Sequence, residues 1–445
     1  MNKRDGLSFR RLTWRAKLAV GAALAAALLL GSPAVADSGQ GWSPDGNLSG
    51  DQSGNHDGGN GWRQDGEHDG GNGWGPGWGH DTSPARQLAV RVRHGRLVDR
   101  HGETVRLLGV NRSGTQYPCV EGWGIFDGPT DAAALDAISA WGANTVRVAL
   151  NEDCWLGING VDPAYSGDAY RTAIHDYVDR LNAAGLRVIL DLHWNAPGTD
   201  LATDQQPMAD RDHAPDFWRS VAAEFRWNRS VVFDLYNEPH PDDENGGDTP
   251  AAWACVRDGG SCPGVPFEAA GMQELLDAVR STGARNVVMV GGPQYAGQLD
   301  RWRDYRPHDP SRQLAASIHI YFNTPDSPEW SPCYLQTCWE QTIAPLASHI
   351  PVVIGELGER DCSSGLIDGT TMTPAQDSLL DWADDHGVSY LAWSWMTSDC
   401  AGEPALISDY DGTPTAYGAG IRDHLLGLQE HGHCRHDFRD HDWDD

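Results

Sequence analysis

Eight short apolar segments recur along the middle of the chain, and amphipathic helical patterns lie between them. Eight strand–helix repeats, spaced about 40 residues apart, are typical of a (β/α)8 TIM barrel, which is an α/β fold. The expected strands are 105–110, 145–150, 187–192, 231–236, 287–291, 315–320, 352–355 and 389–393. The expected helices include 132–140, 170–184, 215–225, 268–282 and 374–386.

Two further patterns support the barrel. Residues 88–108 alternate apolar and polar side chains around two His-Gly pairs, which predicts an N-terminal β-hairpin before the first barrel strand. A doubly wound open sheet would instead require a glycine-rich phosphate loop after the first strand, and residues 110–114 do not form that motif. We therefore expect one barrel domain over residues 87–428.

The two ends of the chain differ from this domain in composition. Residues 1–36 combine basic residues, an apolar run and a small-residue cleavage sequence, which is typical of a signal peptide. Its arginine pair leaves twin-arginine export open beside the general route. Residues 37–86 are rich in Gly, Asp, His and Trp and predict a linker, whose tryptophans could also bind sugars. Residues 429–445 form a His/Asp-rich tail. We expect a secreted, extracellular monomer that leaves the membrane once the signal is removed.

Charge and lysine content exclude several functions. The chain has 33 basic and 63 acidic residues, a formal net charge of −30, so nucleic acid is not an expected partner. The only lysines are Lys3 and Lys17, inside the predicted signal peptide. Without a lysine, a mature protein cannot use Schiff-base chemistry, pyridoxal phosphate or a P-loop lysine.

Two glutamates are the candidate catalytic residues, because the active site of a TIM barrel lies at the C-terminal strand ends. Glu238 follows the fourth expected strand and Glu356 follows the seventh. Two carboxylates about 5 Å apart are the arrangement of a retaining glycosidase. Either glutamate alone could be a structural ion-pair partner, but two at strand ends favour catalysis. The sequence contains no GxSxG or HExxH motif, so we expect neither a serine nucleophile nor a metal or other cofactor.

The segment 231–239, Val-Val-Phe-Asp-Leu-Tyr-Asn-Glu-Pro, resembles the signature of the family 5 glycoside hydrolases, the cellulase family A. Segments around 144–147, 191–194, 319–321 and 354–358 are similar to the family's other motifs. The resemblance implies that Glu238 is the acid/base and Glu356 the nucleophile. The substrate-binding residues that it implies are Arg147, His193, Asn237, His319, Tyr321 and Trp395, with Trp393 as the alternative to Trp395.

The identity of the glycan stays open at this point. Residues 151–155 and Arg112 depart from the commonest cellulase pattern. We expect an endo-β-1,4-glucanase acting on a cellulose-like polysaccharide. The alternatives are the same chemistry on mannan or β-1,3-glucan, exo-β-glucosidase action, or a carbohydrate-binding protein without catalysis. Several tryptophans follow strand ends and could bind sugars or pack in the core: Trp123, Trp155, Trp194, Trp330 and Trp339.

The order of strands around a barrel predicts how the cysteines pair. Of nine cysteines, eight follow strand ends on the catalytic face, and Cys434 is left over in the tail. Loops that follow neighbouring strands lie side by side, and two pairs fall within single loops. The expected disulfides are Cys119–Cys154, Cys255–Cys262, Cys333–Cys338 and Cys362–Cys400.

Overall fold

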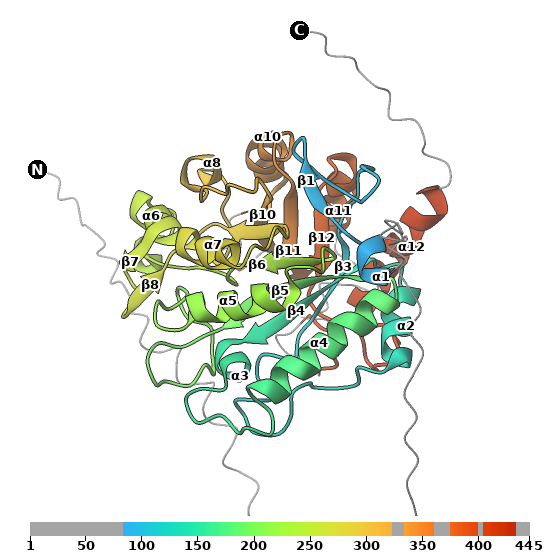
Figure 1. The fold of residues 1–445 in the computed structure, drawn as a ribbon. Coiled ribbons are helices and arrows are strands. Elements are labelled where there is room, and N and C mark those ends of the chain that lie inside the picture. The colour runs from blue at the N-terminus through green and yellow to red at the C-terminus, as the bar shows by residue number, and fades with distance from the viewer. Residues whose placement is uncertain (1–82, 323–332, 360–373, 399–403, 433–445) are drawn as a thin grey trace, which may run out of the picture. The chain divides into compact units, whose positions relative to one another are not determined.

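Eight parallel strands form a closed barrel at the centre of the molecule. In the computed structural model, the described residues are 83–322, 333–359, 374–398 and 404–432 (Figure 1). The strands, in the order in which they pair around the barrel, are β3 (Leu108–Arg112), β4 (Thr145–Asn151), β5 (Arg187–Trp194), β6 (Val231–Asp234), β9 (Val288–Gly291), β10 (Leu314–Phe322), β11 (Val352–Glu359) and β12 (Ser389–Ala392). The predicted TIM barrel is confirmed, with all eight expected strands.

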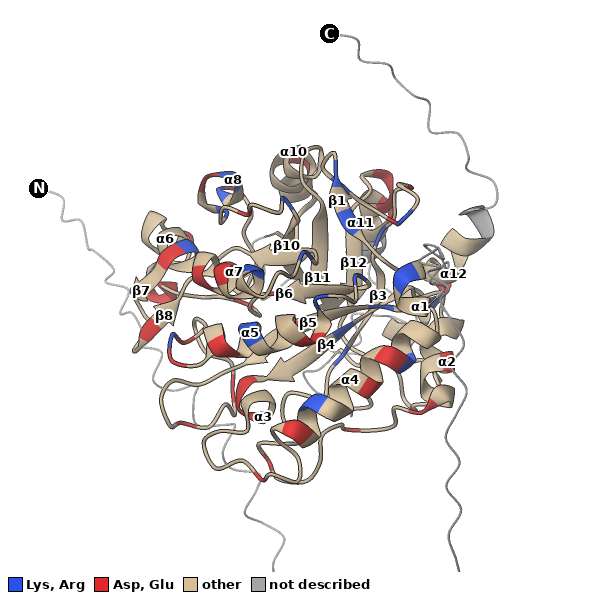
Figure 2. Ribbon diagram, viewed as in Figure 1, with Lys and Arg blue, Asp and Glu red and all other residues tan. Residues whose placement is uncertain are grey.

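Helices surround the barrel and follow the strands (Figure 1). The longer helices are α2 (Ala132–Ala140), α4 (Asp168–Ala183), α5 (Ala214–Phe225), α6 (Pro250–Asp258), α7 (Met272–Ser281), α11 (Pro374–Asp385) and α12 (Ala416–Gly432). The shorter ones are α1 (Pro84–Gln87), α3 (Glu152–Leu156), η2 (Asp243–Asn245), α8 (Trp302–Tyr305), α9 (Gln336–Cys338), η3 (Trp339–Ile343) and α10 (Ala344–Ala347). Acidic residues are spread over outer helices such as α4 and α7, in keeping with the negative net charge (Figure 2).

Many of the expected boundaries differ from the structure by a few residues, and three of these differences bear on the fold. The first barrel strand begins at Leu108 rather than at 105, because Val105 donates its N–H to Leu97 O and so extends the hairpin. The helix expected from 268 begins at Met272, because residues Glu268–Ala270 form β8, which pairs antiparallel with β7 (Gly259–Ser261). Helix α12 continues past 428, where the barrel domain was expected to end.

The core has two layers. The inner layer fills the barrel with apolar side chains from six strands: Ile189, Val232, Met289, Ala315, Val353 and Leu391. Val90 and Leu97 pack against this layer and close the N-terminal end of the barrel. The outer layer lies between the strands and the helices and contains most of the buried aromatic side chains. In the part of the chain that the structure describes, no helix is both long and apolar enough to cross a membrane.

The hairpin that closes the barrel consists of β1 (Arg91–Arg93) and β2 (Arg96–Val98), which pair antiparallel. Its two-residue turn has positive φ angles, 50° at His94 and 74° at Gly95, as tight hairpins require. A Cβ atom at Gly95 would lie 2.5 Å from the His349 carbonyl oxygen, so only glycine fits there.

Three disulfides connect loops at the C-terminal ends of the strands. Cys119–Cys154 joins the loops after β3 and β4, while Cys255–Cys262 and Cys333–Cys338 each close a short local loop. These three pairings are confirmed. The fourth predicted pair, Cys362–Cys400, lies outside the described residues, as do the predicted signal peptide and nearly all of the predicted linker.

Candidate active site

A polar layer lies directly above the apolar inner layer of the barrel. Side chains two residues apart on a strand point to the same face, so Asp191 follows Ile189 into the barrel and Asp234 follows Val232. The buried polar residues of this layer are Asn111, Arg147, Asp191, Asp234, Ser317 and Glu356. The barrel therefore brings together polar residues that are distant in sequence, at the strand ends where active sites form.

An irregularity in β11 turns Glu356 toward the barrel axis. Val353 packs in the inner layer and Ile354 in the outer one, so strict alternation would point residue 356 outward. The register shifts at this point, because Ile318 of β10 faces Ile354 but His319 faces Glu356. A β-bulge inserts one extra residue and re-aims the side chain that follows it.

Glycine at position 355 makes room for this bulge. A Cβ atom on Gly355 would lie 2.9 Å from Ser317 Oγ and 3.0 Å from His319 Nε2, both on the neighbouring strand. Because real Cβ contacts are longer, any other residue here would displace His319 or the bulge. The position of Glu356 thus depends on the glycine that precedes it.

Arg147 on β4 connects the polar layer and is fully buried. Its guanidinium donates to Asn111 Oδ1, Asp234 Oδ2 and Asn237 Oδ1 at 3.0 Å each and to Glu356 Oε1 at 2.7 Å, and one of its nitrogens lies 3.0 Å from Asp191 Oδ2. Burial alone would lower the pKa of Arg147, but the surrounding carboxylates raise it above its usual range. The guanidinium is therefore a fixed positive charge at the base of the site.

Glu356 has two strong donors, one on each carboxylate oxygen. Besides Arg147 on Oε1, the Tyr321 hydroxyl donates to Oε2 at 2.6 Å. Both partners stabilise a carboxylate that is only 3% exposed, which is the state a nucleophile requires. Arg147 and Tyr321, both among the residues that the family resemblance implies, thus lie beside Glu356.

Glu238 follows β6 and has a different set of neighbours. Its φ angle of 47° places a non-glycine residue in the left-handed region, a strained conformation that is common at functional sites. His319 Nδ1 lies 2.9 Å from Glu238 Oε1, and Gln205 Nε2 donates to Oε2, also at 2.9 Å. Carboxyl oxygens of Glu238 and Glu356 and a ring nitrogen of His319 lie within 4.8 Å of one another.

Glu238 and His319 share a proton. Burial would raise the pKa of Glu238, but the hydrogen bonds and positive charge of His319 lower it below its usual value. Burial would lower the pKa of His319, but the negative charges of Glu356 and Glu238 raise it. Because the two groups face each other, they titrate as a pair, and the pair holds its proton above the usual histidine range.

A further shift occurs at the base of the site. Burial, reinforced by the charge of Asp191 and opposed by Arg147, raises the pKa of Asp234 to about 6. Asp191 accepts at the same time from His193, whose Nδ1 lies 2.6 Å from Asp191 Oδ2. Asp191 is therefore a buried support for Arg147 and His193.

The prediction of Trp395 as the sugar platform does not fit the structure. Its side chain is 1% exposed and packs edge-to-face against Trp141, with ring centroids 4.8 Å apart, so it presents no face to a ligand. Trp393, two residues earlier, is half-buried and stacks on His193 at 5.4 Å with 8° between the planes. The alternative, Trp393, is therefore the aromatic residue that strand β12 contributes to the site.

The other candidate tryptophans divide between cleft and core. Trp155 and Trp339 are buried and belong to the core. Trp194 is half-buried, and Trp123 is 48% exposed. The ring centroid of Tyr117 lies 6.0 Å from that of Trp123 and 6.3 Å from that of Trp194. Trp330 lies outside the described residues.

Gln205 is the residue at the acid/base carboxyl that the sequence did not reveal. It lies in the loop between β5 and α5, and no strand end or motif marks it. Contacts on both sides fix this loop: Ala202 N–H donates to Asp153 Oδ2 at 2.9 Å, and the Tyr236 hydroxyl donates to Gln206 O at 2.6 Å. Only the folded loop brings Gln205 to Glu238.

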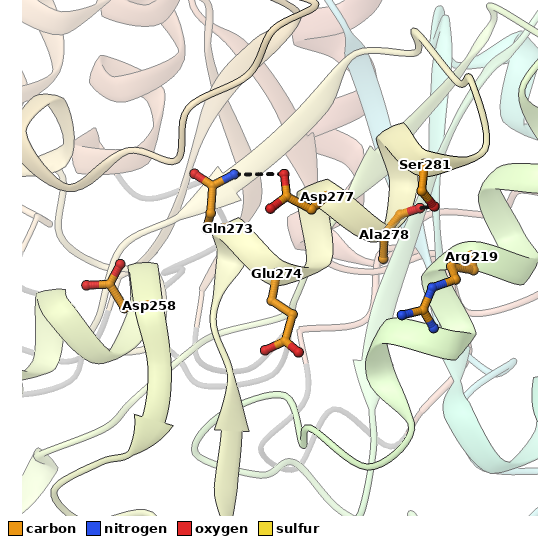
Figure 3. Close-up of a pocket in the computed structure, with 7 residues that line it drawn as sticks. All are labelled: Arg219, Asp258, Gln273, Glu274, Asp277, Ala278 and Ser281. Carbon is orange, nitrogen blue, oxygen red and sulfur yellow. Dashed lines mark hydrogen bonds between the residues drawn. The ribbon is translucent and has the colours of Figure 1, made fainter.

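A hollow on the outer surface is not an alternative active site. It has a volume of about 400 Å³ and is lined mainly by residues of α7, with one residue each from α5 and α6: Arg219, Asp258, Gln273, Glu274, Asp277, Ala278 and Ser281 (Figure 3). Gln273 donates to Asp277, one turn further along the same helix, as Figure 3 shows. These are side chains on the outside of helices, and the strand ends hold the buried paired carboxylates that catalysis requires.

Comparison with known proteins places the sequence in a family. Residues 98–399 match the family model described as Cellulase (glycosyl hydrolase family 5). An endoglucanase from Pectobacterium carotovorum subsp. carotovorum is 23% identical over 304 residues, which cover 68% of this chain and 49% of that protein. A mannan endo-1,4-beta-mannosidase from Streptomyces lividans is 26% identical over 315 residues, which cover 69% of this chain and 66% of that protein.

The chain spans about half the length of the curated endoglucanases from Pectobacterium that it matches. Among solved structures, a beta-glucanase from Saccharophagus degradans in complex with cellotetraose has a TM-score of 0.57 at 21% identity, and the alignment covers 77% of this chain and 94% of that chain. This likeness shows the fold. The family model covers more than half of the sequence, and the chain therefore belongs to the cellulase family, glycosyl hydrolase family 5.

Proposed function

We propose that the protein is a retaining β-glycoside hydrolase, and specifically an endo-β-1,4-glucanase. The observation that carries the proposal is the pair Glu238 and Glu356, with carboxyl oxygens within 4.8 Å of each other. A separation of about 5 Å leaves no room for a water molecule between substrate and carboxylate, so one carboxylate attacks the sugar itself.

In the proposed reaction, Glu356 attacks the anomeric carbon while Glu238 passes the proton that it shares with His319 to the departing glycosidic oxygen. Arg147 and Tyr321 hold Glu356 in position as a carboxylate. Forming the covalent ester removes the negative charge of Glu356, which lowers the pKa of His319 and favours its neutral form. Glu238 then takes a proton from water, which attacks the intermediate and releases the sugar with retained configuration.

The glycan is the finer part of the proposal. Curated relatives include endoglucanases and mannan endo-1,4-beta-mannosidases, so mannan is the second candidate substrate. Assays on pure cellulose derivatives, mixed-linkage glucan, β-1,3-glucan and mannan would distinguish them. Proton NMR of the first product should show the β anomer, and an α anomer would contradict double displacement.

Loss of Glu238 tests the acid role directly. Glu238→Ala should slow turnover of polysaccharide by about 10²- to 10⁴-fold, because the leaving oxygen loses its proton donor. Substrates with activated leaving groups should be spared in the first step. Equal losses on both kinds of substrate would contradict the assignment.

Two further expectations belong to this proposal. We infer that the protein acts outside the cell, which the three disulfides support because they persist in oxidising surroundings. We also infer that it needs no metal, although Glu238, His319 and Glu356 are close enough together to hold one. Dialysis against a chelator should leave activity intact, and a loss restored by one added metal would overturn this inference.

A further inference from the structure

Arginines gather at the end of the barrel that lies opposite the catalytic glutamates. Arg187 begins β5, and Arg229 and Arg285 lie just before β6 and β9, which are the next two strands around the barrel. Arg91 begins β1, and the preceding Val90 donates its N–H to Arg229 O at 2.9 Å. Arg91 and Arg285 are exposed, while Arg187 and Arg229 are half-buried. These four arginines form a basic face beside the hairpin that closes the barrel.

The positive charges of the basic face have no ion-pair partners in the described part of the chain, whereas nearby Arg280 has an aspartate at 2.8 Å. Burial, reinforced by the positive charges of Arg285 and Arg280, lowers the pKa of Arg229. Burial also lowers the pKa of Arg187, and the charge of Asp99 opposes this effect. A protein with a formal net charge of −30 thus keeps unpaired positive charges together, where they attract an anion.

An exposed tryptophan lies at the edge of the basic face. Trp227, between α5 and β6, is 82% exposed, and its ring centroid lies 5.4 Å from Cζ of Arg226. Arg226 in turn donates to Thr282 O at 3.2 Å, in the loop that precedes β9. Asn286 Nδ2 of that loop donates to Asn228 O at 2.8 Å, so the two loops are fixed to each other. An aromatic ring therefore stands in a fixed position beside the unpaired arginines.

This combination of groups indicates the kind of anion that the face can bind. Guanidinium groups bind carboxylates through paired N–H donors, and tryptophan rings pack against the C–H faces of sugars. A sugar polymer that carries carboxylates offers both contacts at once. Nucleic acid is less suitable, because duplex DNA has about one charge per 1.7 Å and the acidic remainder of this protein repels such a dense polyanion. A polyuronate has a single carboxylate on each sugar and is repelled less.

We propose that the basic face and Trp227 bind an acidic polysaccharide, a polymer of uronic acids. The site lies at the opposite end of the barrel from Glu238 and Glu356. It therefore goes beyond the proposed function and does not depend on which glycan is cleaved. Binding at this face leaves the catalytic strand ends free, so the protein stays attached to a matrix that contains acidic polysaccharide while it acts on a neutral one.

An oligogalacturonate of about ten sugars tests the proposal by isothermal titration of the full chain. Binding should be measurable at about 20 mM salt and at least about tenfold weaker at about 200 mM, because salt screens exposed charges. The double variant Arg229→Gln/Arg285→Gln should lower the affinity at least about tenfold and flatten the salt dependence. Trp227→Ala should lower the affinity about three- to tenfold, because the stacking contact is lost.

The matched control removes two arginines that already have acidic partners. Arg219 pairs with Asp216, and Arg257 pairs with Asp258 at 2.7 Å. Arg219→Gln/Arg257→Gln changes the net charge by the same amount and should leave the affinity within about twofold of the wild type. Thermal unfolding shows whether each variant folds. If the Arg229 variant does not, Arg285→Gln alone, at an exposed position, is compared with Arg219→Gln.

The outcomes distinguish this inference from its rivals. Absence of binding at low salt, or equal losses in the two double variants, would overturn it. An unchanged affinity in Trp227→Ala, or tighter binding of a single-stranded oligonucleotide of the same charge, would overturn the assignment to a polysaccharide. Hydrolysis is measured separately, on neutral polysaccharides. A wild type that cleaves none of them would overturn the proposed function and leave the binding result unaffected.

Discussion

The molecule buries two groups of carboxyl side chains at the same end of the barrel, and they differ in their neighbours. The first contains Glu356 and the aspartates around Arg147, where an arginine and several hydrogen-bond donors face the carboxylates. The second contains Glu152, Asp153 and Asp210, where Glu152 is fully buried and makes no ion pair among the described residues. The same residue types therefore occupy two different electrostatic environments.

The difference decides the charge of each group. Neither carboxyl oxygen of Glu152 has a hydrogen bond of good geometry within the described part of the chain. Burial, and then the negative charges of Asp210 and Asp153, raise the pKa of Glu152 well above its usual value. The surroundings of Glu152 thus favour its protonated form, whereas Glu356 has two donors for a carboxylate. Burial of a carboxyl group alone does not make a catalytic residue.

Replacing one glutamate of each group with glutamine should show the largest difference between the two groups. Glu356→Gln removes the nucleophile and should lower kcat by at least about 10⁴-fold. Glu152→Gln replaces a carboxyl group whose surroundings favour the protonated form with an amide of the same shape, and it should leave kcat within about threefold. Initial rates on the best polysaccharide measure both, and a large loss in Glu152→Gln would show that the second group takes part in catalysis.

The disulfide beside the second group should contribute strongly to stability. Cys119–Cys154 joins residues 35 apart, and Cys333–Cys338 joins residues 5 apart. Chain entropy predicts about 4 kcal/mol of stabilisation for the longer loop and about 2 kcal/mol for the shorter one. Replacing each pair with serine and measuring urea unfolding compares them directly. A larger loss for the shorter loop would contradict the entropic explanation.

Gln205 links the two groups, because the loop that Asp153 anchors carries Gln205 to Glu238. Gln205→Leu should lower kcat on oligosaccharides about tenfold, the effect of one lost hydrogen bond to a charged group. That hydrogen bond lowers the pKa of Glu238, so its loss should move the alkaline limb of the kcat/KM profile to higher pH. Thr203→Val, at an exposed position in the same loop, is the control. An unchanged pH profile would mean that Gln205 has only a structural role.

The smallest expected effect concerns stability against pH. Above the usual glutamate pKa of 4.5, the unfolded chain ionises Glu152 while the folded protein keeps its proton. The wild type therefore loses stability as pH rises through this range, until the raised folded-state pKa is reached. Glu152→Gln cannot ionise and should gain stability relative to the wild type by at most about 1.4 kcal/mol per pH unit. Unfolding at a series of pH values tests this, with Asp136→Asn on the exposed face of α2 as the control.

Much of the fold was predictable because its signals are local. Strand and helix periodicity in each segment does not depend on the rest of the chain, so all eight strands were found. The order of strands then predicted three disulfides. The errors at the first strand and at α7 arose where a hairpin partner elsewhere in the chain competed for the same residues.

The sequence by itself determined the barrel, the family and the two glutamates at its mouth. Tertiary structure decided which of the two tryptophans after β12 reaches the site, because Trp393 and Trp395 lie just beyond the end of the strand and differ in what packs against them. It also decided the placement of Gln205 beside Glu238. The charge of a buried carboxyl group follows from donors and charges brought by other loops, and no local pattern in the sequence records which loops those are.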